Sequence, residues 1–286
     1  MTTVVNGALS AVVLFNNCVD TFGYIKLGLK FGEDYQRYQL KLDVAETRLG
    51  RWGEAVGVNS DERFASASPT DEAVKNALEI LMDLKTCFEV AQNKSRRYAG
   101  NADEKEPTVH DINDMNPTFQ QLHNRSKDIA RRRQKGISIV KKTAWALYDR
   151  KSFDNIVNQI VSWVDELEKL FPTEVACQKF IKMEINEVND EPSLTALKDA
   201  AHGIDPALEH TVKHKVDSIG GRNSARNIRM ENRARVHVGN IVAERVLQHE
   251  VRVNDQANNV AEDIIARDDA RGHIGNVWGG RSIWDD

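Results

Sequence analysis

Apolar side chains recur at alternating steps of three and four residues through much of the chain before residue 220. This spacing places them on one face of an α-helix, as expected for helices that pack on a common core. The three clearest stripes are Tyr35, Tyr38, Leu42, Ala45, Leu49 and Trp52; Val74, Ala77, Leu78, Leu81, Leu84 and Phe88; and Phe153, Ile156, Ile160, Val164, Leu167 and Phe171.

Residues that favour helix ends flank these stripes. Thr70 is the predicted N-cap of the second stripe, and Ser152 opens the third. Asp205 and Pro206 form an N-cap and first-turn pair for a last helix, which the two glycines at residues 220–221 should stop. No convincing run of alternating strand residues precedes this point. We therefore predict an all-α helical bundle, an effector domain, for residues 1–221, followed by a second domain in residues 222–286.

The tail differs sharply in composition. Between residues 216 and 286 there is no lysine, proline or cysteine, Leu247 is the only leucine, and Trp278 and Trp284 are the only large aromatics. So few large apolar side chains cannot build a conventional core that offsets the entropy lost on ordering. We expect this tail to be disordered as a monomer and to gain structure on assembly.

Two copies of one segment occupy the tail, at residues 223–244 and 259–280, with a polar flexible tether at residues 245–258. Eight of the 22 aligned positions are identical, whereas unrelated segments of average composition match at about one or two. Such a duplication predicts units that stack on each other. The identical pairs are Asn223/Asn259, Ala225/Ala261, Ile228/Ile264, Ala234/Ala270, Arg235/Arg271, His237/His273, Gly239/Gly275 and Asn240/Asn276.

Three aligned pairs carry opposite charges. In an in-register stack, equivalent side chains lie about 4.7 Å apart, so opposite charges attract where identical ones would repel. The predicted charge ladder is Arg226/Glu262, Glu231/Arg267 and Arg233/Asp269, whereas Arg235/Arg271 and Arg245/Arg281 carry like charges.

The remaining positions suit a short β-rung. Apolar and polar residues alternate around residues 234–238, as in a strand with one buried face. Asparagine amides can stack into hydrogen-bonded ladders, and glycines allow a corner between strands. The predicted solenoid core is Ala225, Ile228, Ala234, Val236, Val238, Ala261, Ile264, Ala270 and Ile274; the ladders are Asn223/Asn259 and Asn240/Asn276; the corners are Gly239 and Gly275; and Trp284 is a C-terminal aromatic candidate.

Each copy is then one rung of a β-solenoid. Two rungs alone bury little and expose strand edges, so further molecules must add rungs for stability. The sequence thus predicts nucleated, templated self-assembly. A pair of hairpins, or a disordered tail with an accidental repeat, is the alternative interpretation, which the identities and charge exchanges disfavour.

The N-terminus contains a candidate membrane segment. Asn16, Asn17 and Asp20 interrupt its apolar run, and a central Asp costs about 2.5 to 3.5 kcal/mol on insertion scales. The pattern therefore predicts a helix that is buried in the bundle, with a purely structural role and conditional insertion both open. Its stripe is Val4, Ala8, Ala11, Phe15, Val19 and Phe22.

Charge and motifs narrow the class of function. The net charge of −4 does not by itself imply a nucleic-acid partner. Cys18, Cys87 and Cys177 form no paired motif, so we expect reduced thiols and a cytoplasmic location. His210 and His214 stand one helical turn apart without an evident third ligand. Since no nucleotide-binding or hydrolase motif occurs, we expect no enzyme, no catalytic residue, no metal and no cofactor.

Alternatives to a membrane-active assembly remain at this point. The basic residues 131–135, followed by Lys141 and Lys142, could contact nucleic acid or anionic lipid, although a solvated helix face is the simpler interpretation. An amyloid-forming adaptor or structural self-assembly protein without membrane activity is the other alternative.

Five long segments carry a family resemblance. They are residues 7–20 (GALSAVVLFNNCVD), 51–56 (RWGEAV), 141–149 (KKTAWALYD), 164–169 (VDELEK) and 197–205 (LKDAAHGID). With the repeat spacing and the closing Trp284 and Asp285, they resemble the fungal HET-s/HET-S family of heterokaryon incompatibility proteins. The resemblance implies a HeLo-type helical domain followed by a prion-forming domain that folds as a left-handed β-solenoid amyloid.

The resemblance also implies a mechanism. In this family the prion domain is templated by like amyloid or by a matching motif on an NLR-type receptor. The N-terminal segment of the helical domain is then expelled and inserts into the membrane, which causes programmed cell death. For this chain it implies self and an NLR-type receptor as partners, conditional membrane contact, no nucleic acid, and relocation from the cytoplasm to the plasma membrane or to aggregates. Toxic and non-toxic versions of the family both remain open.

Overall fold

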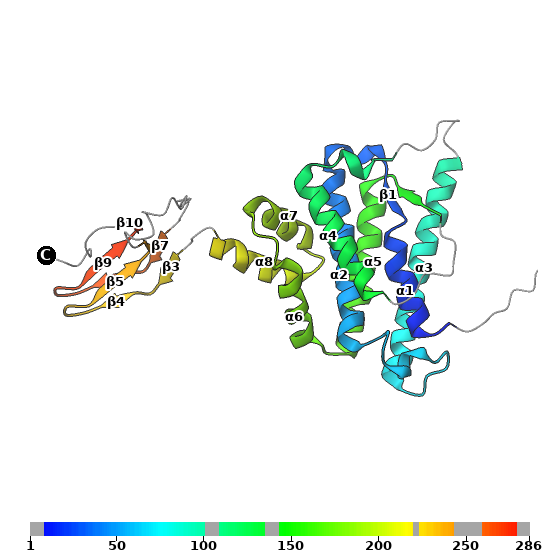
Figure 1. The fold of residues 1–286 in the computed structure, drawn as a ribbon, viewed down its shortest axis with the longest axis horizontal. Helices are drawn as coiled ribbons and strands as arrows, with labels where there is room; N and C mark the ends of the chain where they lie inside the picture. The colour runs from blue at the N-terminus through cyan, green and yellow to red at the C-terminus, as the bar shows by residue number, and fades with distance from the viewer. Residues whose placement is uncertain (1–8, 101–108, 135–142, 220–222, 243–258, 279–286) are drawn as a thin grey trace, which may run out of the picture. The chain divides into compact units, whose positions relative to one another are not determined.

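The computed structural model divides into two compact units, residues 1–212 and 213–286. The first unit is a helical bundle, and the second consists of short parallel strands (Figure 1). The boundary between the units falls within the last helix, ahead of the domain boundary predicted at residue 221. The structure describes residues 9–100, 109–134, 143–219, 223–242 and 259–278.

The predicted helical stripes lie in helices of the bundle, which confirms the all-α class of this region. Three short 3-10 helices, η1 (Leu29–Asp34), η2 (Glu62–Ala65) and η3 (Ile112–Asp114), connect them within the described residues. The α-helices are α1 (Ala11–Phe22), α2 (Tyr35–Val56), α3 (Glu72–Gly100), α4 (Pro117–Arg133), α5 (Arg150–Leu170), α6 (Glu174–Ile185), α7 (Glu191–Ala201) and α8 (Pro206–Ile219).

Helix α2 occupies the middle of the bundle (Figure 1) and contacts α1, α4, α5, α6 and α7. Leu42, Leu49 and Trp52 of its predicted stripe are buried. The structure also buries Arg48 and Arg51, which lie outside the predicted apolar stripe. Because neighbours surround α2 on several sides, its charged residues must find partners inside the protein.

Two helices begin at different residues from those predicted. The Asp71 carboxylate, not Thr70, accepts hydrogen bonds at the start of α3, including one from the Ala73 amide at 2.9 Å. Asp149 caps α5 and accepts the Ser152 amide at 2.8 Å, so Ser152 lies inside the first turn. In both cases the carboxylate of a nearby Asp satisfies an N–H group that the helix leaves unpaired.

The bundle also contains one small sheet, which the expectation of no strands before residue 220 missed. Strand β1 (Ile25–Leu27) pairs in parallel with β2 (Trp145–Leu147), and Ile25 lies opposite Trp145. Strands of three residues are too short for an alternating pattern to show in the sequence. The sheet joins two segments that are far apart in the chain, but it does not change the helical class.

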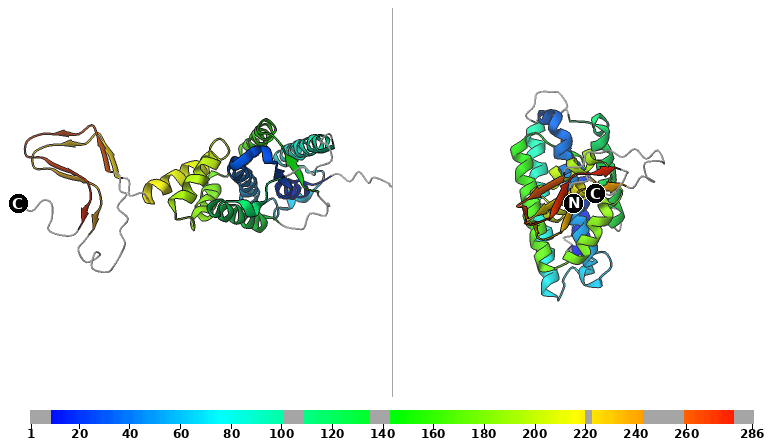
Figure 2. Two further views of the ribbon diagram at one scale, coloured as in Figure 1. Left: turned by 90° about the horizontal axis from the view of Figure 1, so that it is seen from above. Right: turned by 90° about the vertical axis from the view of Figure 1, so that its left-hand side faces the viewer.

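The C-terminal unit is a two-layer stack of parallel strands. Each strand of the first copy pairs with the equivalent strand of the second, so that β3 pairs with β7, β4 with β8, β5 with β9 and β6 with β10. Seen from above, the two copies follow the same bent path (left part of Figure 2). The strands are β3 (Asn223–Arg226), β4 (Arg229–Met230), β5 (Arg235–Val238), β6 (Ile241–Val242), β7 (Asn259–Glu262), β8 (Ile265–Ala266), β9 (Arg271–Ile274) and β10 (Val277–Trp278).

Four corners of the stack use residues that the repeat analysis did not single out. Asn227, Asn232, Asp263 and Asp268 have φ angles of 56°, 60°, 56° and 59°. Asn and Asp tolerate this left-handed conformation better than other residues that carry a side chain. They occupy equivalent places in the two copies, so a search for turn residues shared by the copies would have found them.

Candidate functional site

The stacked copies, here called rung 1 (residues 223–242) and rung 2 (residues 259–278), form the first part of the candidate site. Their backbone hydrogen bonds continue through the corners, as in the bond from the Ile265 amide to the Ile228 carbonyl at 2.8 Å. The same offset of 36 residues holds from Asn223 to Val242. The two copies are therefore in register, which is the arrangement predicted for the assembled tail.

Two of the three exchanged charge pairs meet in the stack. Arg226 Nε lies 2.8 Å from Glu262 Oε2, and Arg267 Nη1 lies 3.8 Å from Glu231 Oε1. All four side chains are exposed, so each pair contributes about 1 kcal/mol or less to stability. A slipped stack would lose both contacts, so these pairs favour the in-register arrangement.

The third exchanged pair does not meet within one molecule. Among the described residues, Arg233 and Asp269 form no ion pair with each other; they directly follow the left-handed corner residues Asn232 and Asp268. The Asn232 backbone N–H instead donates to Asp268 Oδ2 at 3.2 Å. An Arg233–Asp269 contact between molecules stays a prediction.

The four ladder asparagines form one hydrogen-bonded cluster. The Asn223 amide donates to Asn259 Oδ1 at 2.8 Å, from rung to rung as predicted. Within rung 1 the Asn223 side-chain amide also donates to Asn240 Oδ1 at 3.2 Å, and within rung 2 the Asn259 side-chain amide donates to Asn276 Oδ1 at 3.1 Å. Between the rungs, the Asn240 backbone N–H donates to Asn276 Oδ1 at 2.9 Å.

The core of the stack is uneven between rungs. Val238 and Met230 on rung 1 are buried, whereas Ile264 and Ile274 on rung 2 are 41% and 48% exposed. In the single chain rung 2 is the end of the described stack, so the burial of these two isoleucines in the assembled solenoid stays a prediction. The partly buried core residues are Ala225, Ile228, Ala234, Val236, Ala261 and Ala270.

Met230 is a core residue that the repeat analysis missed. It is 4% exposed, and its equivalent in rung 2 is Ala266. Because the two residues differ, a comparison that counts identical pairs between the copies does not detect this position. The Met230 side chain lies over Gly272, where an added Cβ would meet its terminal methyl at 3.3 Å. The large residue of one rung therefore fills space left by small residues of the other.

The predicted corner glycines approach each other directly. A Cβ on Gly239 would lie 1.9 Å from the backbone oxygen of Gly275, so only glycine fits there. Gly275 itself adopts a φ of 146°. Trp284, the predicted C-terminal aromatic, and the tether at residues 245–258 lie outside the described residues.

His237 and His273 form a stacked pair that the sequence showed only as an identity. Their rings lie 5.0 Å apart at 11°, and their Nδ1 atoms are 3.0 Å apart. This contact needs at least one Nδ1 without a proton, because two N–H groups would repel. The neighbouring Arg235 and Arg271, aligned in the same strands, already add positive charge nearby.

Removing one imidazole of the pair should slow assembly. His237→Leu deletes one of the two nitrogens that are in contact between the rungs, so we expect the elongation rate of fibrils, measured by thioflavin fluorescence after seeding, to fall. His214→Leu, in helix α8, is the control and should keep the wild-type rate. Equal rates for the two variants would contradict the role of the pair.

Reversing a charge in the closest ion pair should also slow assembly. Glu262→Arg places a positive charge against Arg226, so the seeded elongation rate should fall. The double exchange, with Arg226→Glu added, restores opposite charges and should recover most of the rate. A double variant that elongates no faster than the single one would show that charge complementarity does not set the register.

The candidate membrane segment forms the second part of the site. Ala11, Phe15, Val19 and Phe22 of α1 are fully buried in the bundle, whereas Val4 and Ala8 lie outside the described residues. Phe22 packs on Phe88 with ring centroids 5.2 Å apart, and Phe15 packs on Trp52 at 6.1 Å. The stripe is thus held by α2 and α3 in this structure.

Phe15 lies directly against the backbone of α2. A Cβ on Gly53 would fall 2.1 Å from the Phe15 ring, so this glycine provides the space that the ring occupies. The Trp52 indole beside it donates to the Leu167 carbonyl at 3.1 Å and is fixed by α5. None of the helices in the described part of the chain has both the length and the apolarity required to cross a bilayer.

The basic segment is only partly a solvated helix face. Arg131 and Arg132 are exposed, but Arg133 points inward, with its Nη2 2.7 Å from Glu184 Oε1 and its guanidinium over the Phe180 ring. Lys135, and the lysines at 141–142, lie outside the described residues. Arg133 is therefore part of the packed bundle, which weakens the nucleic-acid alternative.

The cysteines differ in their surroundings. Cys18 is buried on α1, whereas Cys87 and Cys177 are partly exposed, and all three are free thiols. Burial raises the pKa of the Cys87 and Cys177 thiols, which reduces the thiolate available for reaction. Of the three cysteines, only Cys18 is a core residue.

Within the described residues no three potential metal ligands cluster, and His210 and His214 are exposed.

Comparison with known proteins covers nearly the whole chain. Residues 3–197 match the HeLo family, described as "Prion-inhibition and propagation", and residues 215–279 match the family "Het-s 218-289". The "Heterokaryon incompatibility protein s" of Podospora anserina is 50% identical over 282 residues, 99% of this chain and 98% of that protein. The "Heterokaryon incompatibility protein S" of the same species gives the same identity and coverage.

Solved structures agree for the helical part. The HET-s N-terminal domain is 52% identical, has a TM-score of 0.73, and covers 75% of this chain and 100% of its own. A doubly substituted form of that domain gives 51% identity and a TM-score of 0.71, with 74% and 100% covered.

Fold and comparisons together define a prion protein with a helical HeLo domain and a C-terminal prion region. The chain belongs to the HET-s/HET-S family of heterokaryon incompatibility proteins. This confirms the resemblance found in the sequence. It also gives the general function, which is that of a self-assembling prion protein in heterokaryon incompatibility.

Proposed function

We propose that templated growth of the β-solenoid switches the helical domain to a membrane-active form that causes programmed cell death. One observation carries the assembly step. Rung 2 repeats rung 1 in register but leaves Ile264, Ile265 and Ile274 exposed on the described end of the stack. A further copy of rung 1 placed there would cover these side chains, and covering apolar surface contributes about 25 cal/mol per Å².

The state of α1 supports the membrane step. Its apolar stripe is buried in the bundle and thus withheld from lipid until the bundle opens. The segment then supplies apolar side chains at the N-terminus, including Val4 and Ala8.

Partners in this proposal are the chain itself, an NLR-type receptor with a matching amyloid motif, and the membrane. The protein would move from the cytoplasm to the plasma membrane or to aggregates on activation.

Seeded leakage tests the proposal. Soluble full-length chain is mixed with dye-loaded anionic vesicles, and sonicated fibrils of the same chain are added. We expect thioflavin fluorescence to rise first and dye release to follow, with neither after addition of unseeded buffer. Fibril growth without dye release would instead indicate an adaptor or the non-toxic version of the family. A soluble chain that never converts on seeding would overturn the assembly step itself.

A further inference from the structure

One short part of α2, residues 48–53, contacts both the candidate membrane helix and the start of α8. Trp52 and Gly53 hold Phe15 of α1, as described above. On the other side, Arg48 and Arg51 reach the two residues that precede α8. We call residues 48–53 the coupling segment.

Arg51 binds Asp205, the residue that precedes and caps α8. Its Nη1 lies 2.7 Å from Asp205 Oδ2, while its Nε and Nη2 bind both oxygens of Glu184 at 2.9 and 2.7 Å. Asp205 uses its other oxygen to accept the Leu208 amide at 3.0 Å, which caps α8 as predicted from the sequence. The same carboxylate thus fixes the first turn of α8 and neutralises a charge inside the bundle.

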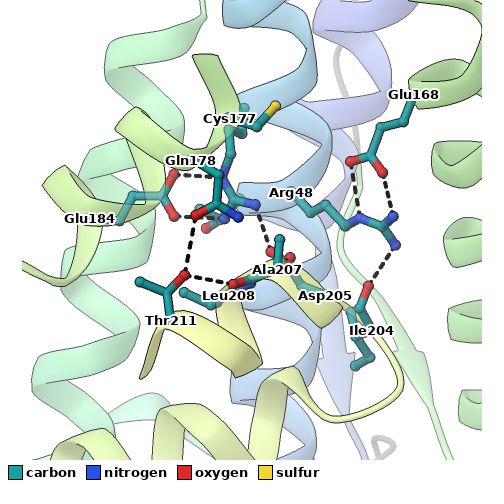
Figure 3. Close-up of polar contacts among 12 residues, drawn as sticks. Arg48, Glu168, Cys177, Gln178, Glu184, Ile204, Asp205, Ala207, Leu208 and Thr211 are labelled. Atoms are coloured by element: carbon teal, nitrogen blue, oxygen red, sulfur yellow. Dashed lines mark hydrogen bonds and ion pairs between the residues drawn. The ribbon is translucent and has the colours of Figure 1, made fainter. Parts of the chain in front are cut away.

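Arg48 holds the preceding residue. Its Nη1 donates to the Ile204 carbonyl at 2.7 Å, and the guanidinium also binds Glu168 and Asp165 of α5. Figure 3 shows the Arg48 side chain between Glu168 and Ile204. The junction between α7 and α8 is therefore attached to α2 at two successive residues.

The buried charges balance only while α8 is in place. Arg51, Arg133, Glu184 and Asp205 carry two positive and two negative charges, and each side chain is less than a tenth exposed. Burial opposes the Arg51 charge, but the carboxylates of Asp205 and Glu184 raise the pKa of its guanidinium above the ordinary value. Withdrawal of Asp205 would leave Arg51 and Arg133 sharing the single carboxylate of Glu184, and an excess buried positive charge strongly destabilises a folded state.

Helix α8 is also the element nearest to the prion region along the chain. It ends at Ile219, and strand β3 begins at Asn223. Among the helices of the bundle, α8 is therefore the one closest in sequence to rung 1.

We propose that Arg51 is the residue that couples displacement of α8 to release of α1. When α8 withdraws Asp205, the unbalanced charge disturbs the coupling segment, and the packing of Trp52 and Gly53 around Phe15 is lost with it. The inference rests on the proposed function, because that function requires the release of α1. Arg51 is then the positioning residue that links the displacement of α8 to this release.

Labelling of Cys18 measures this release directly. Cys18 lies buried on α1, and replacement of Cys87 and Cys177 by serine in the full-length chain leaves it as the only thiol. The rate at which a thiol reagent modifies Cys18 in the soluble, unseeded protein then reports how often α1 leaves the bundle. The assay needs neither fibrils nor vesicles, so its outcome is independent of whether seeding causes leakage.

A double-mutant cycle separates coupling from general damage. Asp205→Asn keeps a capping side chain but removes a charge, and it should raise the Cys18 labelling rate about tenfold or more. Arg51→Leu, which leaves an excess negative charge, should do the same. The two together leave Arg133 and Glu184 as a balanced pair and should return the rate most of the way to that of the parent protein.

Asp71→Asn is the matched control. Asp71 also caps a helix and binds an arginine, Arg63, but at the exposed start of α3, so the labelling rate should not change. The inference is overturned if Asp205→Asn leaves the rate unchanged. It is equally overturned if the double variant is labelled faster than both single variants, because additive damage would then explain the result.

Discussion

Replacing Gly53 with alanine should loosen α1 and lower the thermal stability of the helical domain. The new methyl group would lie 2.1 to 2.9 Å from three atoms of the Phe15 ring, which is fully buried and cannot turn aside. Overpacking of this kind costs about 1 to 3 kcal/mol, against about 1 kcal/mol gained from replacing glycine in a helix. Thermal unfolding followed by circular dichroism should show Tm lowered by several degrees, at about 2 to 4 °C per kcal/mol.

Gly50→Ala provides the control on the same helix. A Cβ there would meet the Arg133 side chain at 3.5 Å, an ordinary contact, so the gain in helix propensity should appear without a clash. We expect Tm to stay constant or rise. Vesicle leakage without seeds should increase for Gly53→Ala only. Equal behaviour of the two variants would show that the close approach of Phe15 to α2 does not hold α1.

Replacing Gly239 with alanine should abolish seeded assembly while the helical domain stays folded. The methyl group would sit 1.9 Å from the carbonyl oxygen of Gly275, and neither backbone can move away without breaking the bond from the Gly275 amide to the Val238 carbonyl, 2.9 Å long. Register at β5 and β9 would be lost with it. Thioflavin fluorescence after seeding should stay at the unseeded level, with an unchanged Tm for the helical domain.

Gly272→Ala is the matched variant on rung 2. Its methyl group would meet only the flexible end of Met230 at 3.3 Å, which can shift. Gly272 also lies opposite Val236, where an apolar side chain suits the strand pattern. Seeded assembly should therefore persist at a rate near that of the wild type. If neither glycine variant assembles after seeding, the tail tolerates no added methyl group at either position. The close contact between Gly239 and Gly275 would then not be the specific cause of the loss.

The sequence predicted the features that depend on local pattern. The helical stripe of α2 and the equivalence of Asn223 with Asn259 could be read from spacing alone, because each follows from a fixed period. Strand β1 could not, because its partner β2 lies more than a hundred residues away and neither strand is long enough to alternate visibly.

The missed residues share a different cause. Met230 differs from its repeat partner, so a search for identities gives it no weight. Arg51 is charged and lies outside the apolar stripe, yet α2 is enclosed and Glu184 and Asp205 supply the partners that permit burial. No local pattern in one sequence records which distant carboxylates will meet an arginine. The helix starts at Asp71 and Asp149 were misplaced by only a few residues for the simpler reason that several capping residues stand close together.

The unequal rungs have a consequence for the growing fibril. Because the two copies pair in parallel, every molecule presents rung 1 at one face and rung 2 at the other, and the side chains differ: Met230 and Val236 on the first, Ala266 and Gly272 on the second. A fibril built in this way has a direction, with two chemically distinct tips. Its tips should elongate at different speeds, and a peptide copy of one rung should cap only the tip that it fits.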